Sequence, residues 1–283
     1  MKHLVSTDWL RDHLDAPELV ILDCSNFSGL AENGQQYVTR SGFKAWEKGH
    51  IPGSRLADFT TGLAGDSTKY RNTLPRSGKF AELMGELGIG ADSCVVLYDT
   101  AQSMWAARVW WMLRWIGFDN AAILDGGWQS WKNNEGPIST KHSRCQPNRL
   151  TPILRSELFS TKDDIISALN KRSTCIIDAL STAQFNGEKS ELGLSSHIPG
   201  AINIPAESLL DPETGCYLPK EQLATRLPEN RQAHTIVYCG SGIAASSVAF
   251  AMTHLDFSNV SIYMPGLQEW VQDYDVGVHS DKI

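Results

Sequence analysis

The sequence predicts an α/β protein made of two tandem domains of one fold, each a mainly parallel β-sheet with helices on both faces. Three observations lead to this prediction. Short apolar runs typical of strands alternate with helical patterns, the same set of motifs occurs twice, and a polar segment containing prolines separates the two copies. A length of 283 residues is sufficient for two domains of ordinary size.

The duplication is the strongest signal in the chain. Five motifs recur in the same order: "STDWLRDHL" (6–14) with "STKDDIISAL" (160–169), "LVILDCS" (19–25) with "TCIIDAL" (174–180), "GHIPGSRLADF" (49–59) with "SHIPGAINIPA" (196–206), "CVVLYD" (94–99) with "HTIVYC" (234–239), and "LDGGWQSW" (124–131) with "YMPGLQEW" (263–270). We therefore predict domains at 1–139 and 158–283, joined by a linker at 140–157.

The elements of each copy follow from hydrophobic pattern. Strands are expected at "VILDC", "VVLYD" and "AAILD" in the first half and at "CIIDAL", "TIVYC" and "VSIYM" in the second. Helices are expected at "SGKFAELMGELG", "WAARVWWMLRWIG", "KEQLATRL" and "AASSVAFAMTHL". Apolar strands separated by helices indicate a parallel sheet covered on both faces, in which functional groups lie at the carboxyl ends of the strands.

Composition excludes several classes of protein. A net charge of −7 without a Lys/Arg run argues against nucleic-acid binding. The longest apolar stretch, 104–118, is too short to span a membrane and carries Arg108 and Arg114. The N-terminus has no apolar signal core, and the six cysteines are scattered without a C-x-x-C pair. We expect reduced thiols, a cytoplasmic location, and no metal, membrane or nucleic-acid partner.

Cys239 stands at the carboxyl end of a predicted strand, in "IVYCGSGIAASSVAFAMTHL" (236–255). Small residues follow it before a helix: Gly240, Ser241, Gly242, Ile243, Ala244 and Ala245. Such a loop directs main-chain N–H groups inward and adds the positive end of the helix dipole, which together hold an anion. A thiolate in this position has a lowered pKa and acts as a nucleophile.

The alternative is an ordinary buried cysteine, which is how we interpret Cys24, Cys94 and Cys175. The duplication helps to decide between the two, because Asp99 occupies the equivalent position in the first half and no glycine pair follows it. If the Cys239 loop is a chemical site, it occurs once in the chain.

The chain resembles the two-domain rhodanese-like sulfurtransferases. The resemblance covers nearly the whole sequence and rests on the repeated "HIPG", the "DGGW" of the first half, the helix "ARVWWMLRWIGF" and the Cys239 loop. It implies a degenerate N-terminal domain with Asp99 in place of the cysteine. It also implies cofactor-free transfer of a sulfane sulfur to Cys239, giving a persulfide that cyanide, a dithiol or a protein thiol, such as a thioredoxin-like protein, then consumes.

Within that family, "CGSG" resembles the 3-mercaptopyruvate type, since the thiosulfate type usually has Arg and Lys in the loop. Ser241 is then expected to assist catalysis by hydrogen bonding. His50 matches a family histidine proposed to work with that serine, although a histidine before Ile-Pro-Gly also suits a structural role. We interpret His197 as structural.

The sequence departs from the family pattern where arginines should hold the donor's carboxylate. Leu180 and Gln184 stand in those positions, and a bidentate Arg clamp is therefore missing. Lys189 is the nearest cation along the chain. Arg76, in "TLPRSGKF", is a candidate replacement across an interdomain cleft, and a solvated surface arginine is the alternative.

Two other classes of function compete with a sulfurtransferase. A Cys-x5-Arg phosphatase would need Arg at the sixth position after Cys239, where Ala245 stands. A persulfide carrier module would accept sulfur from a partner protein and have no small-molecule donor of its own. Turnover of a small donor distinguishes the enzyme from the carrier.

Overall fold

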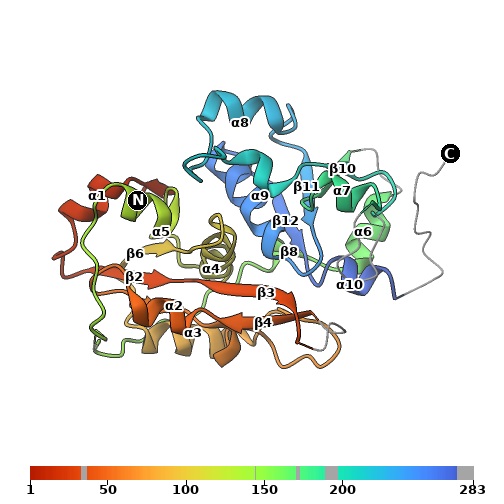
Figure 1. Ribbon diagram of the computed structural model, residues 1–283. Helices are drawn as coiled ribbons and strands as arrows, with labels where there is room; N and C mark the ends of the chain where they lie inside the picture. Colours follow the sequence, from red (N-terminus) through yellow and green to blue (C-terminus); the bar gives the residue numbers. More distant parts are fainter. Residues whose placement is uncertain (33–36, 144, 170–172, 189–196, 273–283) are drawn as a thin grey trace. The chain divides into compact units, whose positions relative to one another are not determined.

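The computed structural model describes residues 1–32, 37–143, 145–169, 173–188 and 197–272 (Figure 1). The chain divides into two compact units. Unit 1 comprises Met1–Asp66, Leu74–Arg155 and Pro212–Cys216, and unit 2 comprises Ser67–Thr73, Ser156–Asp211 and Tyr217–Ile283. The duplicated α/β fold is confirmed. The boundaries at 139 and 158 stay predictions.

Unit 1 contains a five-stranded, fully parallel sheet with the strand order β1-β7-β6-β2-β5. Its strands are β1 (Leu4–Val5), β2 (Leu19–Asp23), β5 (Arg55–Leu56), β6 (Cys94–Tyr98) and β7 (Ala121–Leu124). Its helices are α1 (Thr7–Asp12), α2 (Phe43–Lys48), the 3₁₀ turn η1 (Phe59–Thr61), α3 (Ser77–Glu86), α4 (Met104–Trp115) and α5 (Gly127–Asn133).

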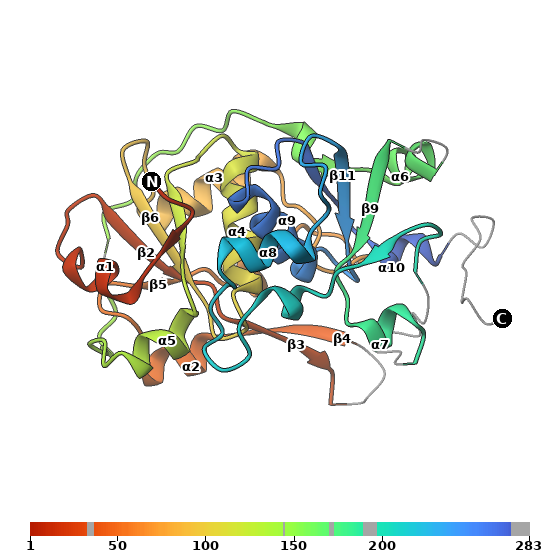
Figure 2. The same cartoon turned by 90° about the horizontal axis from the view of Figure 1, so that it is seen from above.

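Unit 2 repeats this arrangement. Its parallel sheet has the order β10-β9-β11-β12-β8, which is the order of unit 1 read from the opposite edge. The strands are β8 (Phe159–Ser160), β9 (Thr174–Asp178), β10 (Ile202–Asn203), β11 (His234–Tyr238) and β12 (Val260–Tyr263). The helices are η2 (Ser156–Leu158), α6 (Lys162–Leu169), α7 (Thr182–Phe185), η3 (Ala206–Leu209), α8 (Lys220–Arg226), α9 (Ile243–His254) and α10 (Leu267–Trp270). Figure 2 shows β9 beside β11, as their register requires.

Two motifs that recur in the sequence have matching structural roles. In each unit the "HIPG" turn donates a main-chain N–H to the hydroxyl of the last tyrosine of the central strand. The donor is Ile51 to Tyr98 (3.3 Å) in unit 1 and Ile198 to Tyr238 (2.9 Å) in unit 2. The turn therefore fixes the carboxyl end of β6 or β11, from which the functional loop departs.

Each unit has an apolar cluster that includes a fully buried tryptophan. Trp131 packs in unit 1 with buried side chains that include Leu10 and Tyr98, and Trp270 packs in unit 2 with Ile165 and Tyr238. These are separate hydrophobic clusters, so burial stabilises each unit in its own right. Among the described residues, no helix is long and apolar enough to cross a membrane.

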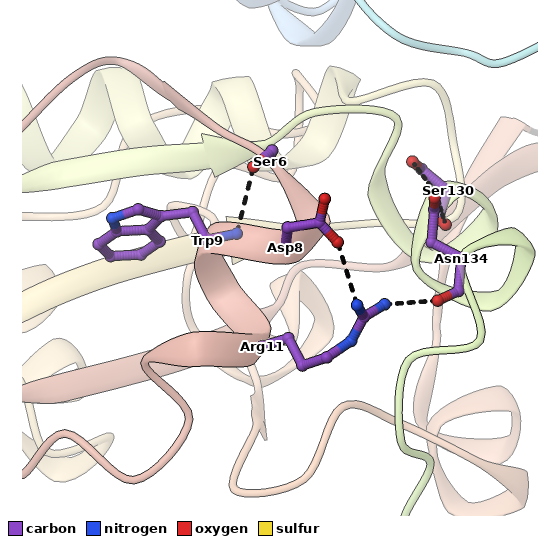
Figure 3. Close-up of polar contacts among 6 residues, drawn as sticks. All are labelled: Ser6, Asp8, Trp9, Arg11, Ser130 and Asn134. Carbon is purple, nitrogen blue, oxygen red and sulfur yellow. Dashed lines mark hydrogen bonds and ion pairs between the residues drawn. The ribbon is translucent and has the colours of Figure 1, made fainter.

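The N-terminal motif of the duplication begins a capped helix (Figure 3). Ser6 caps α1 by accepting a hydrogen bond from the N–H of Trp9 (3.2 Å), which satisfies a donor that the first turn leaves unpaired. Arg11 in the last turn binds Asp8 (3.0 Å) and also donates to the carbonyl of Asn134, at the end of α5. This cation at two helix termini ties the first helix of unit 1 to its last.

The structure adds elements that hydrophobic pattern did not predict. An antiparallel hairpin joins β3 (Asn26–Leu30) to β4 (Tyr37–Ser41) in unit 1, with Phe27 and Leu30 exposed. The edge strands β1, β5, β8 and β10 have two residues each. Two residues are too few to show a period, and the exposed hairpin has no buried face to impose one.

Candidate active site

Cys239 lies between the carboxyl end of β11 and the start of α9, as the sequence predicts. Gly242 caps the helix in the left-handed region, at φ 83°, where a residue with a β-carbon is disfavoured. The Cys239 side chain is 3% exposed, and its Sγ accepts a hydrogen bond from the N–H of Gly242 at 3.1 Å. The loop thus curls around the sulfur.

Opposing effects act on the thiol. Burial raises the pKa of Cys239 above its ordinary value, and main-chain N–H groups of Ala245, Ser241 and Gly242 act in the opposite direction by stabilising the thiolate. The negative charge of Asp178 also raises this pKa. The sequence predicted a lowered pKa. Desolvation outweighs the loop in the structure because the sulfur is almost fully covered.

The glycine of the last repeated motif holds this loop in place. Gly266 allows the N–H of Leu267 to reach the carbonyl of Cys239 (2.9 Å), while the N–H of Gln268 lies 3.3 Å from the carbonyl of Gly240. A β-carbon at Gly266 would lie 2.2 Å from the Cys239 carbonyl oxygen. The glycine of "MPGL" is therefore required for close approach of two backbones.

We call the loop whose main-chain N–H groups face the Cys239 sulfur the cradle. Unit 1 contains the same cradle, filled by the carboxyl group of Asp99. Asp99 is 2% exposed, and its oxygens accept main-chain hydrogen bonds from Ala101 (2.7 Å), Ser103 (2.9 Å) and Ala106 (2.8 Å). Gly127 plays the part of Gly266, since a β-carbon there would lie 2.5 Å from the Asp99 carbonyl oxygen. The scaffold thus directs main-chain N–H groups at an acidic side chain in both copies, and in unit 2 a sulfur stands where unit 1 has a carboxyl group.

The two histidines of the "HIPG" motifs share one structural arrangement. His50 stacks on Trp46 (centroids 4.1 Å apart) and places Nδ1 2.8 Å from the Trp46 carbonyl. His197 stacks on Phe185 (3.9 Å) with Nδ1 3.0 Å from the Phe185 carbonyl. The Nε2 of buried His50 also lies 3.1 Å from the carbonyl of Lys141. These contacts are those of a structural histidine, and a catalytic role for His50 stays a prediction.

Leu180 and Gln184, which stand where the family arginines were expected, have structural contacts. Gln184 forms a capping box with Ser181 at the start of α7, so its amide is engaged with the helix terminus. Leu180 packs against the apolar core of unit 2. Lys189 lies outside the described residues. Arg76 is exposed as the N-cap of α3 in unit 1, and its role in donor binding stays a prediction.

The remaining predicted residues of the loop, and the cysteines predicted to be unreactive, are placed as follows. Ile243 and Ala244 form the first turn of α9, and both are partly exposed. Burial raises the pKa of Cys24, Cys94 and Cys175, which suits unreactive thiols. Among the described residues, no group of three His, Cys, Asp or Glu side chains could hold a metal ion.

Sequence reasoning missed one neighbour of the loop, the 67–73 segment. Asn72, from the N-terminal half of the sequence, donates from Nδ2 to the Oγ of Ser241 at 3.2 Å. The side-chain amide of Gln268 pairs with the main chain of Arg71, with both hydrogen bonds 2.9 Å long. No local pattern signals a contact between residues 169 positions apart.

The fold and the site define a buried cysteine in a loop of inward-facing main-chain N–H groups on a duplicated α/β scaffold, and comparison with known proteins gives the family. The rhodanese-like domain matches residues 6–134 and 161–273. The chain therefore belongs to the rhodanese-like family, and relatives named sulfurtransferases, at about 30% identity over nearly the whole chain, show that it is a sulfurtransferase.

Relatives of both donor types are similar to this chain. The 3-mercaptopyruvate sulfurtransferase of Escherichia coli K12 is 31% identical, with 98% of both chains covered. The thiosulfate sulfurtransferase of Bos taurus is 30% identical, with 94% of this chain and 91% of the relative covered. The crystal structure of the Escherichia coli 3-mercaptopyruvate sulfotransferase SseA matches with a TM-score of 0.79 at 31% identity, covering 93% of this chain and 98% of that chain.

Proposed function

We propose that this chain moves a sulfane sulfur from 3-mercaptopyruvate, through a persulfide on Cys239, to a thiophilic acceptor such as a dithiol, a protein thiol or cyanide. The observation that supports the proposal most directly is the exchange of groups between the two cradles. The same ring of main-chain N–H groups surrounds a carboxylate at Asp99 and a sulfur at Cys239. A cradle that suits an anion stabilises a thiolate and a persulfide.

The chemistry has two sulfur transfers. In the first, the Cys239 thiolate attacks the donor's sulfur and forms the S–S bond, while the C–S bond breaks and its electron pair leaves as the enolate of pyruvate, which takes up a proton. In the second, the acceptor attacks the outer sulfur, and the Cys239 thiolate is the leaving group. The electrons balance without a cofactor, because the carbon is reduced as the sulfur is oxidised to the sulfane level.

In this proposal the hydroxyl of Ser241, two residues after Cys239, assists the transfer by hydrogen bonding. Its main-chain N–H stabilises the Cys239 thiolate, and its side chain lies on the same short loop. In this loop Gly240 and Ser241 stand where cations would attract the thiosulfate dianion. A neutral hydroxyl suits the carbonyl or the thiol of a keto-acid donor better.

Cys239→Ser is expected to abolish sulfur transfer, a loss of at least about a thousandfold, because the nucleophile is removed. Mass spectrometry of the wild-type chain after exposure to donor should find an increase of about 32 Da, one sulfur atom, on the peptide that contains Cys239. Cys24→Ser is the matched control, since that thiol is also buried but lies outside the cradle. Full activity in the Cys239 variant would contradict the mechanism.

Donor choice gives an independent prediction. The kcat/KM for 3-mercaptopyruvate should exceed that for thiosulfate by at least about tenfold, equivalent to about 1.4 kcal/mol. Steady-state kinetics with cyanide as the common acceptor measures both values. The reverse ranking would contradict the role given to Ser241, while leaving Cys239 as the sulfur carrier.

A further inference from the structure

We propose that Asn72 is a positioning residue of the active site, which orients the hydroxyl of Ser241 so that its proton is directed at the donor. The inference rests on the proposed function. It starts from the 67–73 segment, which belongs to unit 2 together with the Cys239 loop although it comes from the N-terminal half of the sequence.

The direction of the hydrogen bond carries the inference. The Nδ2 of Asn72 is a donor, so the Oγ of Ser241 accepts at 3.2 Å. A hydroxyl has one O–H and two acceptor lone pairs. Because Asn72 occupies a lone pair, the Ser241 proton is left to donate to another acceptor. An amide does not titrate near neutral pH, so Asn72 orients Ser241 and does not deprotonate it.

The 67–73 segment is itself held firmly against the loop. Gln268 binds the N–H and the carbonyl of Arg71 with its side-chain amide, and its own main-chain N–H points to the carbonyl of Gly240. One glutamine thus connects the residue next to Asn72 with the residue next to Ser241. The Asn72 side chain is buried, at 5% exposed, which limits the positions it can take.

The backbone conformation of Asn72 is one that suits asparagine. Its φ is 54°, in the left-handed region that asparagine tolerates better than most residues with a β-carbon. Asn72→Gly therefore removes the amide without backbone strain, whereas Asn72→Ala would add strain to the loss of the contact. Asp256→Gly is the matched control, because Asp256 is also left-handed (φ 64°), is exposed, and lies beyond the end of α9.

The test is a double-mutant cycle with Asn72→Gly, Ser241→Ala and the double variant, assayed for kcat and KM with 3-mercaptopyruvate. Each single variant should lose about tenfold in kcat, the scale of one hydrogen bond, and the double variant should lose no more than Ser241→Ala alone. Asp256→Gly should keep wild-type kcat. Independent losses that multiply in the double variant would overturn the inference.

Two further measurements separate orientation from support of the loop. Asn72→Asp keeps the shape but offers an acceptor, so it should draw the Ser241 proton away from the donor and lose at least as much kcat as Asn72→Gly. Wild-type kcat in that variant would overturn the donor role of Asn72. The pH profile of Cys239 alkylation should be unchanged in Asn72→Gly, and a shifted profile would show that Asn72 supports the whole cradle instead.

Failure of the proposed function has a different signature. If the wild-type chain transfers sulfur from thiosulfate and none from 3-mercaptopyruvate, the donor assignment is wrong. The same cycle is then measured with thiosulfate, and coupling between Asn72 and Ser241 is still expected. Absence of coupling with a donor that does load Cys239 contradicts the Asn72 inference alone.

Discussion

At the scale of single residues, burial has the largest effect on the pKa of Cys239, the N–H groups of its loop oppose it, and the charge of Asp178 adds a smaller increase. Asp178 ends β9 directly beside Tyr238, which precedes Cys239. Burial raises the pKa of Asp178 to about 6, against the hydrogen bond from the N–H of Leu180, and its charge raises the pKa of the Cys239 thiol. A carboxylate thus opposes the cradle that stabilises the thiolate.

Asp178→Asn is expected to lower the pKa of Cys239, because the variant removes the opposing charge. The rate of alkylation of Cys239 by iodoacetamide, followed against pH, should reach its midpoint at lower pH than in the wild-type chain. Asp164→Asn is the control in unit 2, since the Asp164 carboxylate is bound to Thr161 and does not shift the pKa of Cys239. An unchanged midpoint in Asp178→Asn would contradict this electrostatic link.

The raised pKa of Asp178 also predicts how the free energy of unfolding depends on pH. Asp178 has a higher pKa when folded (about 6) than its ordinary value of 3.8, so the stability contributed by its protonated form is complete below about pH 4. That contribution is lost as pH rises through 6. Urea unfolding of the wild-type chain relative to Asp178→Asn should show this loss between pH 4 and 6. A difference in free energy of unfolding that does not vary with pH would contradict it.

At the scale of elements, the same strand–loop–helix arrangement holds a cysteine in unit 2 and an aspartate in unit 1. In both copies a glycine in the left-handed region lets the first turn of the last helix approach the loop carbonyl, through Trp128 in unit 1 and Leu267 in unit 2. The cradle is therefore built by the scaffold and not by the cysteine. In unit 1 the Asp99 carboxylate satisfies its N–H groups internally, which makes that loop a structural element.

Asp99→Ala should destabilise unit 1 and leave sulfur transfer by the folded protein unchanged. The variant leaves three main-chain donors without their acceptor in a buried place, at a cost of about 1–3 kcal/mol for each N–H that stays unsatisfied. Thermal unfolding measures the loss, and kcat per folded molecule measures the activity. Asp99→Asn, which keeps an acceptor oxygen, should lose less stability. A large fall in kcat for Asp99→Ala would show that unit 1 takes part in the chemistry.

At the scale of the whole molecule, each of the two units has a hydrophobic cluster of its own among the described residues, and the two units share one topology. Trp131 and Trp270 occupy equivalent places in these clusters, and both are fully buried. Because the two clusters have no residue in common, a substitution in one cluster should lower the free energy of local unfolding mainly in its own unit.

Trp131→Ala and Trp270→Ala are each expected to cost about 3–5 kcal/mol. Hydrogen exchange should then accelerate by roughly a hundredfold or more in the sheet of the altered unit, and less in the other. The relevant amides are those of β2, β6 and β7 for Trp131 and of β9, β11 and β12 for Trp270. Equal acceleration in both sheets would show that the units unfold as one.

Much of this protein can be predicted from its sequence, because the information is local or duplicated. The repeated "HIPG" and the Cys239 loop are short segments whose residue types suit one backbone conformation. The Asp99 loop lacks the glycine pair and curls with Gln102 and Ser103 at positive φ, which its residue types do not predict. The β3–β4 hairpin and the two-residue edge strands could not be predicted in this way, because exposed or very short strands carry no hydrophobic period.

The sequence by itself determined the duplicated α/β fold and the family. It also predicts Cys239, and none of the five other cysteines, as the nucleophile, since strand, glycine loop and helix follow one another along the chain. Only the tertiary structure decided whether burial or the loop N–H groups dominate the pKa of Cys239, and which residue binds Ser241. The first depends on how completely the folded chain covers the sulfur. The second depends on Asn72, 169 positions away, reaching the loop when the chain folds. Desolvation and long-range contact are properties of three-dimensional packing, and a local pattern does not encode them.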